Sequence, residues 1–332
     1  MSKAKSHALP PFLRRACMFL LLVTLLGGGL LSTSQHTHAA AARATSFAAT
    51  SQSDPVLFIH GIDSQSVTDC NGLWGTALDY MRGDGYNGPW TGDLRTIGYY
   101  NGDTNCTDNI QDDQYAFYCP LIYRPEDSGT NNEPIENLSC KLAWYIYLNY
   151  SRYGQNVGIV AFSMGGLITR YALAAVARGA DEFPPNLIVH DVVTLGTPHG
   201  GVAYLGDQIA CGGCVEGVEM IYTSYFITVL KEPFGQNPQG QDGTDWSLIG
   251  SQGDLIDPTW VTFTYMSAAH QYFYIRPAYG HNDYPYDTVE DIDAAMRVCM
   301  YCGPADMANS DDYRTERHSL NLIKAALSSN DY

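Results

Sequence analysis

The sequence has 332 residues, of which 35 are acidic and 18 are basic, and its formal net charge at pH 7 is −17. So acidic a chain repels the phosphates of nucleic acids and the anionic surface of membranes, which excludes nucleic-acid binding from its functions. Its length is enough to bury a large hydrophobic core, and α/β chains of this size often fold as one domain.

Residues 1–40 have the layout of a secretory signal peptide. Four basic residues precede an apolar stretch at 16–31, and a run of small residues follows at 39–42. This pattern predicts export, with cleavage between Ala39 and Ala44 and a flexible leader over 41–53. The apolar stretch is short for a membrane span and contains three consecutive glycines; an uncleaved anchor is the alternative. We therefore expect a secreted protein with no stable membrane anchor.

The cysteines predict disulfide bonds. Nine are present, and an even number is left once Cys17 is removed with the signal peptide. In an exported chain such a set is typically oxidised. Cys211/Cys214 and Cys299/Cys302 have the C-x-x-C spacing that also suits a four-thiolate zinc site, an alternative that export disfavours. We expect structural bridges of undetermined connectivity, no metal and no cofactor.

Apolar runs of strand length alternate with helical patterns along the rest of the chain. The runs predict buried strands at 55–62, 94–99, 157–162, 187–195, 246–250 and 271–276, and the patterns predict helices at 73–82, 138–153, 167–177 and 316–327. This alternation predicts a single α/β domain over 54–332, with a mainly parallel central sheet flanked by helices.

Two segments interrupt the alternation. Residues 202–244 are small, polar and then aromatic, and we interpret them as an inserted cap over the site. Their apolar part, Val218–Leu230, is either a mobile lid or a helix packed into the core. Trp260–Ala268 is expected to be extended.

The acidic residues between Asp103 and Asp113 lack EF-hand spacing, so a solvated loop is a better interpretation than a Ca²⁺ site.

The stretch Val157–Tyr171, VGIVAFSMGGLITRY, is the most informative in the chain. A buried strand ends at Phe162, Ser163 follows with small residues around it, and a helix begins directly afterwards. This is the pattern of a nucleophile elbow, in which small neighbours permit a strained turn that exposes a serine hydroxyl. The free N–H groups of the helix N-terminus then point at charge that develops beside the serine. The alternative is an ordinary turn with a capping serine.

Other polar residues also follow predicted strands. They are His60-Gly61, His199, Asp254 and His281. Reactive residues of open α/β sheets collect at the carboxyl ends of the strands, and a serine nucleophile needs a base and an acid that orients the base. Ser163, Asp254 and His281 occur in the chain order Ser, acid, His that is typical of one hydrolase fold. Individually, Asp254 could be a turn residue and His281 an exposed loop histidine, while His60 and His199 are expected to brace the site.

Four stretches resemble the α/β-hydrolase lipases and esterases, especially the small secreted bacterial lipases. They are Phe58-Ile-His-Gly-Ile62, Ala161-Phe-Ser-Met-Gly-Gly166, Ser251-Gln-Gly-Asp254 and Tyr279-Gly-His281. The resemblance implies an α/β-hydrolase fold with an inserted cap or lid. It also implies a Ser163–His281–Asp254 triad and an oxyanion hole made by the N–H groups of Ile62 and Met164.

An alternative triad uses residues nearer the C-terminus. Asp287-Thr-Val and His318-Ser-Leu also resemble the acid and histidine segments of larger lipases, and Asp257 or Asp283 could replace Asp254. Asp254 and His281 are preferred because each directly follows a recognisable strand.

The sequence thus predicts a secreted serine hydrolase that cleaves carboxylic, lipid-like esters through an acyl-enzyme, without a cofactor. An acyltransferase, a thioesterase or a polyester depolymerase would use the same triad, and a non-catalytic binding protein on this fold is a further alternative. The oligomeric state is not predicted.

Overall fold

The computed structural model describes residues 50–119, 124–203, 211–257, 262–289, 295–302, 307, 312–314 and 317–328. The predicted signal peptide and most of the leader lie outside these residues. Thr50, at the end of the expected leader, is buried, and its N–H donates to the Asp191 carboxylate at 2.6 Å. The packed part of the chain therefore begins before residue 54. No helix of the described part is both long and apolar enough to cross a membrane.

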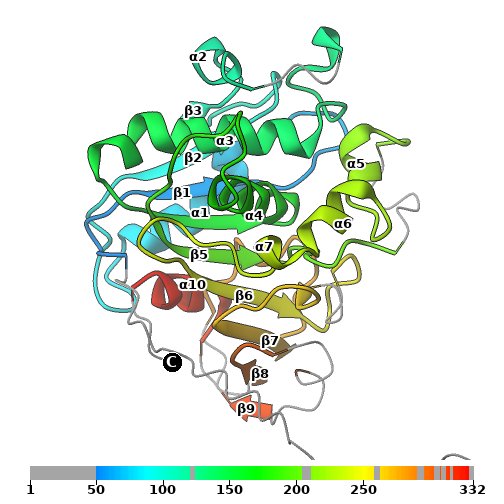
Figure 1. Cartoon of the computed structure of the whole chain (residues 1–332). Coiled ribbons are helices and arrows are strands. Elements are labelled where there is room, and N and C mark those ends of the chain that lie inside the picture. The colour runs from blue at the N-terminus through cyan, green and yellow to red at the C-terminus, as the bar shows by residue number, and fades with distance from the viewer. Residues whose placement is uncertain are drawn as a thin grey trace, which may run out of the picture. The chain divides into compact units, whose positions relative to one another are not determined.

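A nine-stranded sheet forms the centre of the described chain, in the order β3-β2-β1-β4-β5-β6-β7-β8-β9 (Figure 1). The first seven strands of that order run parallel, and β8 and β9 are added antiparallel at one edge. The strands are β1 (Val56–Ile59), β2 (Leu94–Gly98), β3 (Asp108–Asn109), β4 (Val157–Phe162), β5 (Val189–Leu195), β6 (Asp245–Ser251), β7 (His270–Arg276), β8 (Ala295–Cys299) and β9 (Asp312–Arg314).

Helices cover both faces of this sheet (Figure 1). They are α1 (Cys70–Arg82), α2 (Asp113–Ala116), α3 (Ile135–Asn149), α4 (Met164–Ala177), α5 (Val215–Glu219), α6 (Tyr225–Leu230), α7 (Pro233–Gln236) and α10 (Ser319–Ser328). Alternate residues of β4 enter two different cores: Ile159 packs with α3 and α4, and Val160 packs with α1 and α10. Because both faces are buried, the central strands β1 and β4 are continuously apolar in sequence. The predicted α/β class is confirmed.

The structure departs from the sequence prediction at several places. Strands β3, β8 and β9 were not predicted; all three are short and lie near the edges of the sheet, and β8 and β9 pair antiparallel. Of the segment Trp260–Ala268, expected to be extended, residues 260–261 lie outside the described part. The remainder begins with a helical residue, Thr262, and continues in turns, so the prediction of an extended segment is wrong there.

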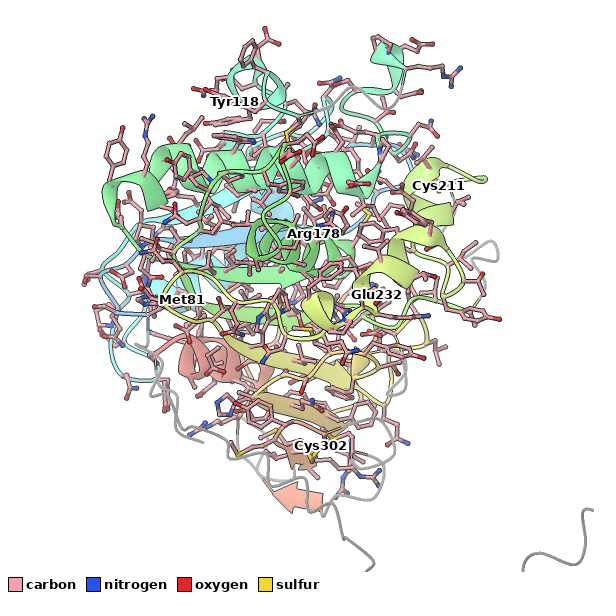
Figure 2. All side chains as sticks on the ribbon, viewed as in Figure 1. Met81, Tyr118, Arg178, Cys211, Glu232 and Cys302 are labelled. Atoms are coloured by element: carbon pink, nitrogen blue, oxygen red, sulfur yellow. A yellow bond between two sulfur atoms is a disulfide. The ribbon has the colours of Figure 1, made fainter. Side chains whose placement is uncertain are left out.

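Four disulfide bonds join the cysteines: Cys70–Cys106, Cys119–Cys140, Cys211–Cys214 and Cys299–Cys302. Both C-x-x-C pairs are therefore internal bridges, one in the cap and one at the end of β8 (Figure 2). Among the described residues no group of three or more potential ligands is arranged to hold a metal ion.

The base of the cap is fixed to α4 by one buried arginine. Arg170 is fully buried, and its guanidinium donates to four backbone carbonyls, those of His199, Leu230, Gly235 and Tyr265, at 2.5–2.8 Å. The apolar residues of α6, Phe226, Ile227 and Leu230, belong to the α3/α4 core. Helix α6 is thus packed into the core, the second of the two interpretations of Val218–Leu230.

Asp191, inside β5, gives the fold a pH-dependent stability. Its Oδ1 atom has no hydrogen-bond partner among the described residues, and burial raises the pKa of the carboxyl to about 7, with a further contribution from Asp245. A carboxyl whose pKa is raised by folding stabilises the native state below its unfolded pKa, and this contribution is lost as pH rises through the folded pKa.

Asp191→Asn should therefore increase the free energy of unfolding at about pH 8, by an amount on the order of 2–4 kcal/mol, and change it little at about pH 4. The amide oxygen can still accept the Thr50 N–H, so the contact is kept. Urea unfolding under non-reducing conditions at both pH values measures this difference, with Asp242→Asn on the exposed surface as the control. An equal effect of Asp191→Asn at both pH values would contradict the raised pKa of the Asp191 carboxyl in the folded protein.

Candidate active site

Ser163 occupies the turn between β4 and α4 in a strained backbone conformation, with φ 53° and ψ −125°. This region is sparsely populated by residues other than glycine. The turn is tight enough that a Cβ on Gly165 would lie 2.5 Å from the backbone oxygen of His60. Only glycine fits at this position. The predicted elbow is present, with Ala161 accommodated as a buried residue at the first small position.

The structure brings Ser163, His281 and Asp254 together, although they come from three different loops. The His281 Nε2 atom is 2.9 Å from the Ser163 Oγ atom, and the His281 Nδ1 atom is 2.8 Å from the Asp254 Oδ2 atom. Asp254 follows β6 and His281 follows β7, which are adjacent parallel strands. The histidine therefore bridges the hydroxyl and the carboxylate.

Asp254 is fully surrounded by donors. Besides His281, its carboxylate accepts the backbone N–H groups of Ile256 at 3.0 Å and Asp257 at 2.9 Å, and the Tyr284 hydroxyl at 3.1 Å. A buried carboxylate needs such partners to remain charged. Tyr284 was not identified from the sequence, because nothing in its local pattern shows that it reaches the acid.

Asp257 lies beside Asp254 but has a different environment. It is fully buried, and burial together with the Asp254 charge raises the pKa of its carboxyl well above the usual range. Its Oδ2 atom accepts the Thr262 hydroxyl at 2.8 Å. Asp283, the other substitute considered for Asp254, accepts the N–H of Gly280 at 2.7 Å. Neither makes the bond to His281 that Asp254 makes.

The alternative acid and histidine are engaged elsewhere. Asp287 accepts the Tyr279 hydroxyl at 2.6 Å. The Nδ1 atom of His318 accepts the N–H of Asn321 in the first turn of α10, and its ring packs edge-on against Tyr80. His318 therefore caps a helix.

The two expected oxyanion donors lie on either side of Ser163. Met164 is the first residue of α4, and Ile62 follows Gly61, where a Cβ would approach the Ser163 Cβ to 2.8 Å. The Gly61–Ile62 backbone thus lies directly against the serine. Among the described residues, the N–H groups of Ile62 and Met164 have no protein acceptor.

A network of side chains holds the loop that contains Ile62. The His60 Nε2 atom lies 3.0 Å from Asp103, its Nδ1 atom lies 2.8 Å from the Gly61 carbonyl, and its ring stacks on Tyr99. The Tyr99 hydroxyl donates to the Gly61 carbonyl at 2.5 Å. His60 therefore braces this loop, and Asp103 belongs to its support, not to a solvated acidic loop. Similarly, His199 is buried and its Nε2 atom lies 3.2 Å from the Thr194 hydroxyl.

A family model described as "Putative serine esterase (DUF676)" matches residues 126–233. This segment contains α3, β4, the Ser163 turn, α4, β5 and much of the cap. It includes neither Asp254 nor His281. No curated protein matches the sequence.

Solved structures similar to this chain include Aspergillus fumigatus lipase B (15% identity, TM-score 0.39), Bacillus licheniformis lipase BlEst2 in its mature form (16%, 0.36) and the Exiguobacterium antarcticum esterase EaEST (10%, 0.38). The matches cover 62%, 60% and 71% of this chain. They cover 39%, 66% and 87% of those proteins, so the chain spans less than two thirds of the first two.

At these TM-scores the assignment of the fold rests on the chain's own topology. A parallel sheet in the order β3-β2-β1-β4-β5-β6-β7 is flanked on both faces by helices, and a strained serine connects β4 to α4. The matched esterase segment spans this same connection. The chain is an α/β-hydrolase-fold protein.

Proposed function

We propose that this protein is an exported serine hydrolase that cleaves carboxylic esters. The observation that carries the proposal is the position of His281, whose two ring nitrogens lie 2.9 Å from the Ser163 hydroxyl and 2.8 Å from the Asp254 carboxylate. This is the arrangement in which a serine is activated by a base whose tautomer is fixed by an acid. The four disulfides and the signal-like sequence of residues 1–40 support export.

In the first half-reaction Ser163 Oγ attacks the ester carbonyl while His281 Nε2 takes the hydroxyl proton. Asp254 accepts the Nδ1–H throughout and stabilises the imidazolium that forms. The tetrahedral oxyanion lies between the N–H groups of Ile62 and Met164, each of which commonly contributes about 3 kcal/mol to such a transition state. The C–O bond then breaks, and the alcohol leaves with the proton from His281.

The second half-reaction repeats these steps with water. His281 takes a proton from water, the resulting hydroxide adds to the acyl carbonyl, and the same two N–H groups bind the new oxyanion. Collapse releases the carboxylic acid, and Ser163 regains its proton from His281. Apart from the ester and water, no other reactant is needed for the balance.

We further propose that the ester carries an apolar acyl group. Leu255, next to Asp254, is 84% exposed, and Tyr265 and Tyr222 are also exposed large side chains. Leu255, which directly follows the proposed acid, can contact an apolar acyl group and remove apolar surface from water. This preference distinguishes lipid-like esters from small polar ones.

Ser163→Ala should lower kcat/KM for p-nitrophenyl esters by a factor of about 10³ or more, because no other nucleophile replaces the hydroxyl. Rates for the purified chain with acyl lengths from acetyl to palmitoyl measure this loss, and the preferred length separates an esterase from a lipase. A fluorophosphonate should label the wild type and not the variant. If wild type and variant hydrolyse every ester equally slowly, the ester-hydrolase proposal is wrong.

Tyr284→Phe should lower kcat about tenfold with little change in KM, because Asp254 loses one charge-assisted hydrogen bond. The matched control is Tyr279→Phe, which removes a buried hydroxyl bonded to Asp287 instead. Its kcat should stay within about twofold of wild type, since Asp287 takes no part in the proposed triad. Rates are expressed per site titrated with fluorophosphonate, so that misfolded protein does not count. An equal loss of kcat in both variants would show that the Tyr284 hydroxyl does not act through Asp254.

A further inference from the structure

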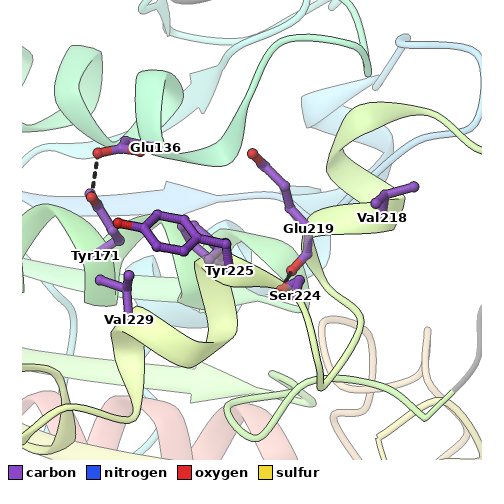
Figure 3. Close-up of a pocket in the computed structure, with 8 residues that line it drawn as sticks. Glu136, Tyr171, Val218, Glu219, Ser224, Tyr225 and Val229 are labelled. Carbon is purple, nitrogen blue, oxygen red and sulfur yellow. Dashed lines mark hydrogen bonds between the residues drawn. The ribbon is translucent and has the colours of Figure 1, made fainter.

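A cavity of about 250 Å³ lies between α3, α4 and the cap helices α5 and α6 (Figure 3). Its lining does not include the three residues of the proposed triad. Eight residues line it: Glu136, Tyr171, Val218, Glu219, Ser224, Tyr225, Phe226 and Val229.

Two carboxylates stand on the walls of this cavity. Glu136, on α3, accepts the Tyr171 hydroxyl, and Glu219, the last residue of α5, accepts the backbone N–H of Ile135 at 2.7 Å. For each carboxylate these bonds use one oxygen. The other oxygen has no protein partner among the described residues.

None of the lining residues is basic. One cation, Arg178, contacts a lining residue. Its Nη2 atom donates to the Tyr171 hydroxyl at 3.1 Å, and its guanidinium lies 5.6 Å from the centre of the Tyr171 ring. Arg178 forms no ion pair with Glu136 or Glu219 within the described part of the chain. Within the described part of the chain, neither carboxylate thus forms a direct ion pair, and Arg178 reaches Glu136 only through the Tyr171 hydroxyl.

The rest of the lining is apolar. Val218, Phe226 and Val229 contribute aliphatic and aromatic surface, and the Tyr225 ring, at 81% exposure, stands at the rim. Tyr171 packs against Phe226, with 5.2 Å between ring centroids. Such walls favour a ligand with apolar substituents, and an aromatic rim adds attraction for a cation.

The charge state of Glu219 reflects this environment. Burial raises the pKa of its carboxyl to about 7, the Glu136 charge adds to the shift, and the Ile135 N–H opposes it. The other titratable groups around the cavity are Tyr171 and Tyr225, with Arg178 behind Tyr171 and Glu216 one turn back on α5. A cation placed between Glu136 and Glu219 would therefore favour the loss of the Glu219 proton.

We propose that this cavity binds a small organic cation, an ammonium group with alkyl substituents. The two carboxylates supply the complementary charge, and the valines and aromatic rings contact the substituents. The same chemistry occurs in a quaternary ammonium headgroup and in a primary amine such as a lysine side chain. The two sources differ in whether the nitrogen can donate a hydrogen bond.

The test is calorimetric titration of the full chain with tetramethylammonium and, separately, with n-butylammonium, at fixed ionic strength. Saturable binding of either cation is expected, and the tighter one identifies the source. Binding should be roughly tenfold or more tighter at about pH 8 than at about pH 5.5, because it is linked to loss of the Glu219 proton.

Glu219→Gln should weaken binding at the higher pH by about tenfold or more and abolish the pH dependence. Glu232→Gln is the matched control, since it removes the same charge from an exposed position outside the cavity (Figure 2). This variant should leave the affinity for the cation and its pH dependence unchanged. Circular dichroism and the thermal midpoint establish that both variants are folded. The proposal is overturned if neither cation binds saturably at the higher pH, or if Glu219→Gln binds as tightly as the wild type.

Discussion

The close contact between the end of β1 and the turn after β4 is the constraint on which the site depends. The α4 backbone at Gly165 touches the carbonyls of Ile59 and His60, and Gly61 in turn touches Ser163. Because the two strands are neighbours in register, Ile59 being paired with Ala161, this contact puts the nucleophile and both expected oxyanion donors at one point of the sheet edge. The strain at Ser163 persists since the surrounding packing leaves the turn no other conformation.

Carboxyl groups near this point are given different properties by their neighbours. Asp254 has four donors around its carboxylate, whereas Asp257, three residues later, has one hydroxyl partner at its carboxyl oxygen and a pKa raised by burial and by the Asp254 charge. The two side chains are chemically identical, so their distinct behaviour comes from the loop conformation alone. A neutral Asp257 also spares Asp254 a second negative charge beside it.

The sequence predicted the parts of the molecule whose signals are local. Strand β4 begins and ends at the predicted residues, because a continuous apolar run meets a serine among small residues. Helix α4 ends at the predicted Ala177 but begins at Met164, three residues before the predicted helical pattern. The residues at strand ends were found for the same reason, since parallel strands share one carboxyl edge. Asp254 was preferred to Asp287 because it directly follows a strand, although both resemble an acid segment and local sequence does not show which one contacts the histidine.

Features that depend on distant contacts had no local signal. Strand β8 is five residues long with an arginine at its centre, and it becomes a strand only by pairing with β7. Tyr284 reaches Asp254 from a loop thirty residues further along the chain, and Glu219 and Glu136 line one cavity from two different helices. Their positions follow from the packing of complete elements, which a pattern in one segment does not contain.

Arg170 decides which parts of the cap can move. Its guanidinium is bonded to backbone carbonyls of α6, α7, the loop after β5 and the turn before β7, so separation of any one of them leaves buried donors unpaired. Loss of such a charge-assisted bond costs roughly 1.5–3 kcal/mol, and rigid opening of the whole cap would break several at once. Burial lowers the pKa of Arg170 to about 9, which is still high enough to keep it charged at neutral pH. Movement of α6 and α7 away from α4 would therefore leave the buried guanidinium without two of its acceptors.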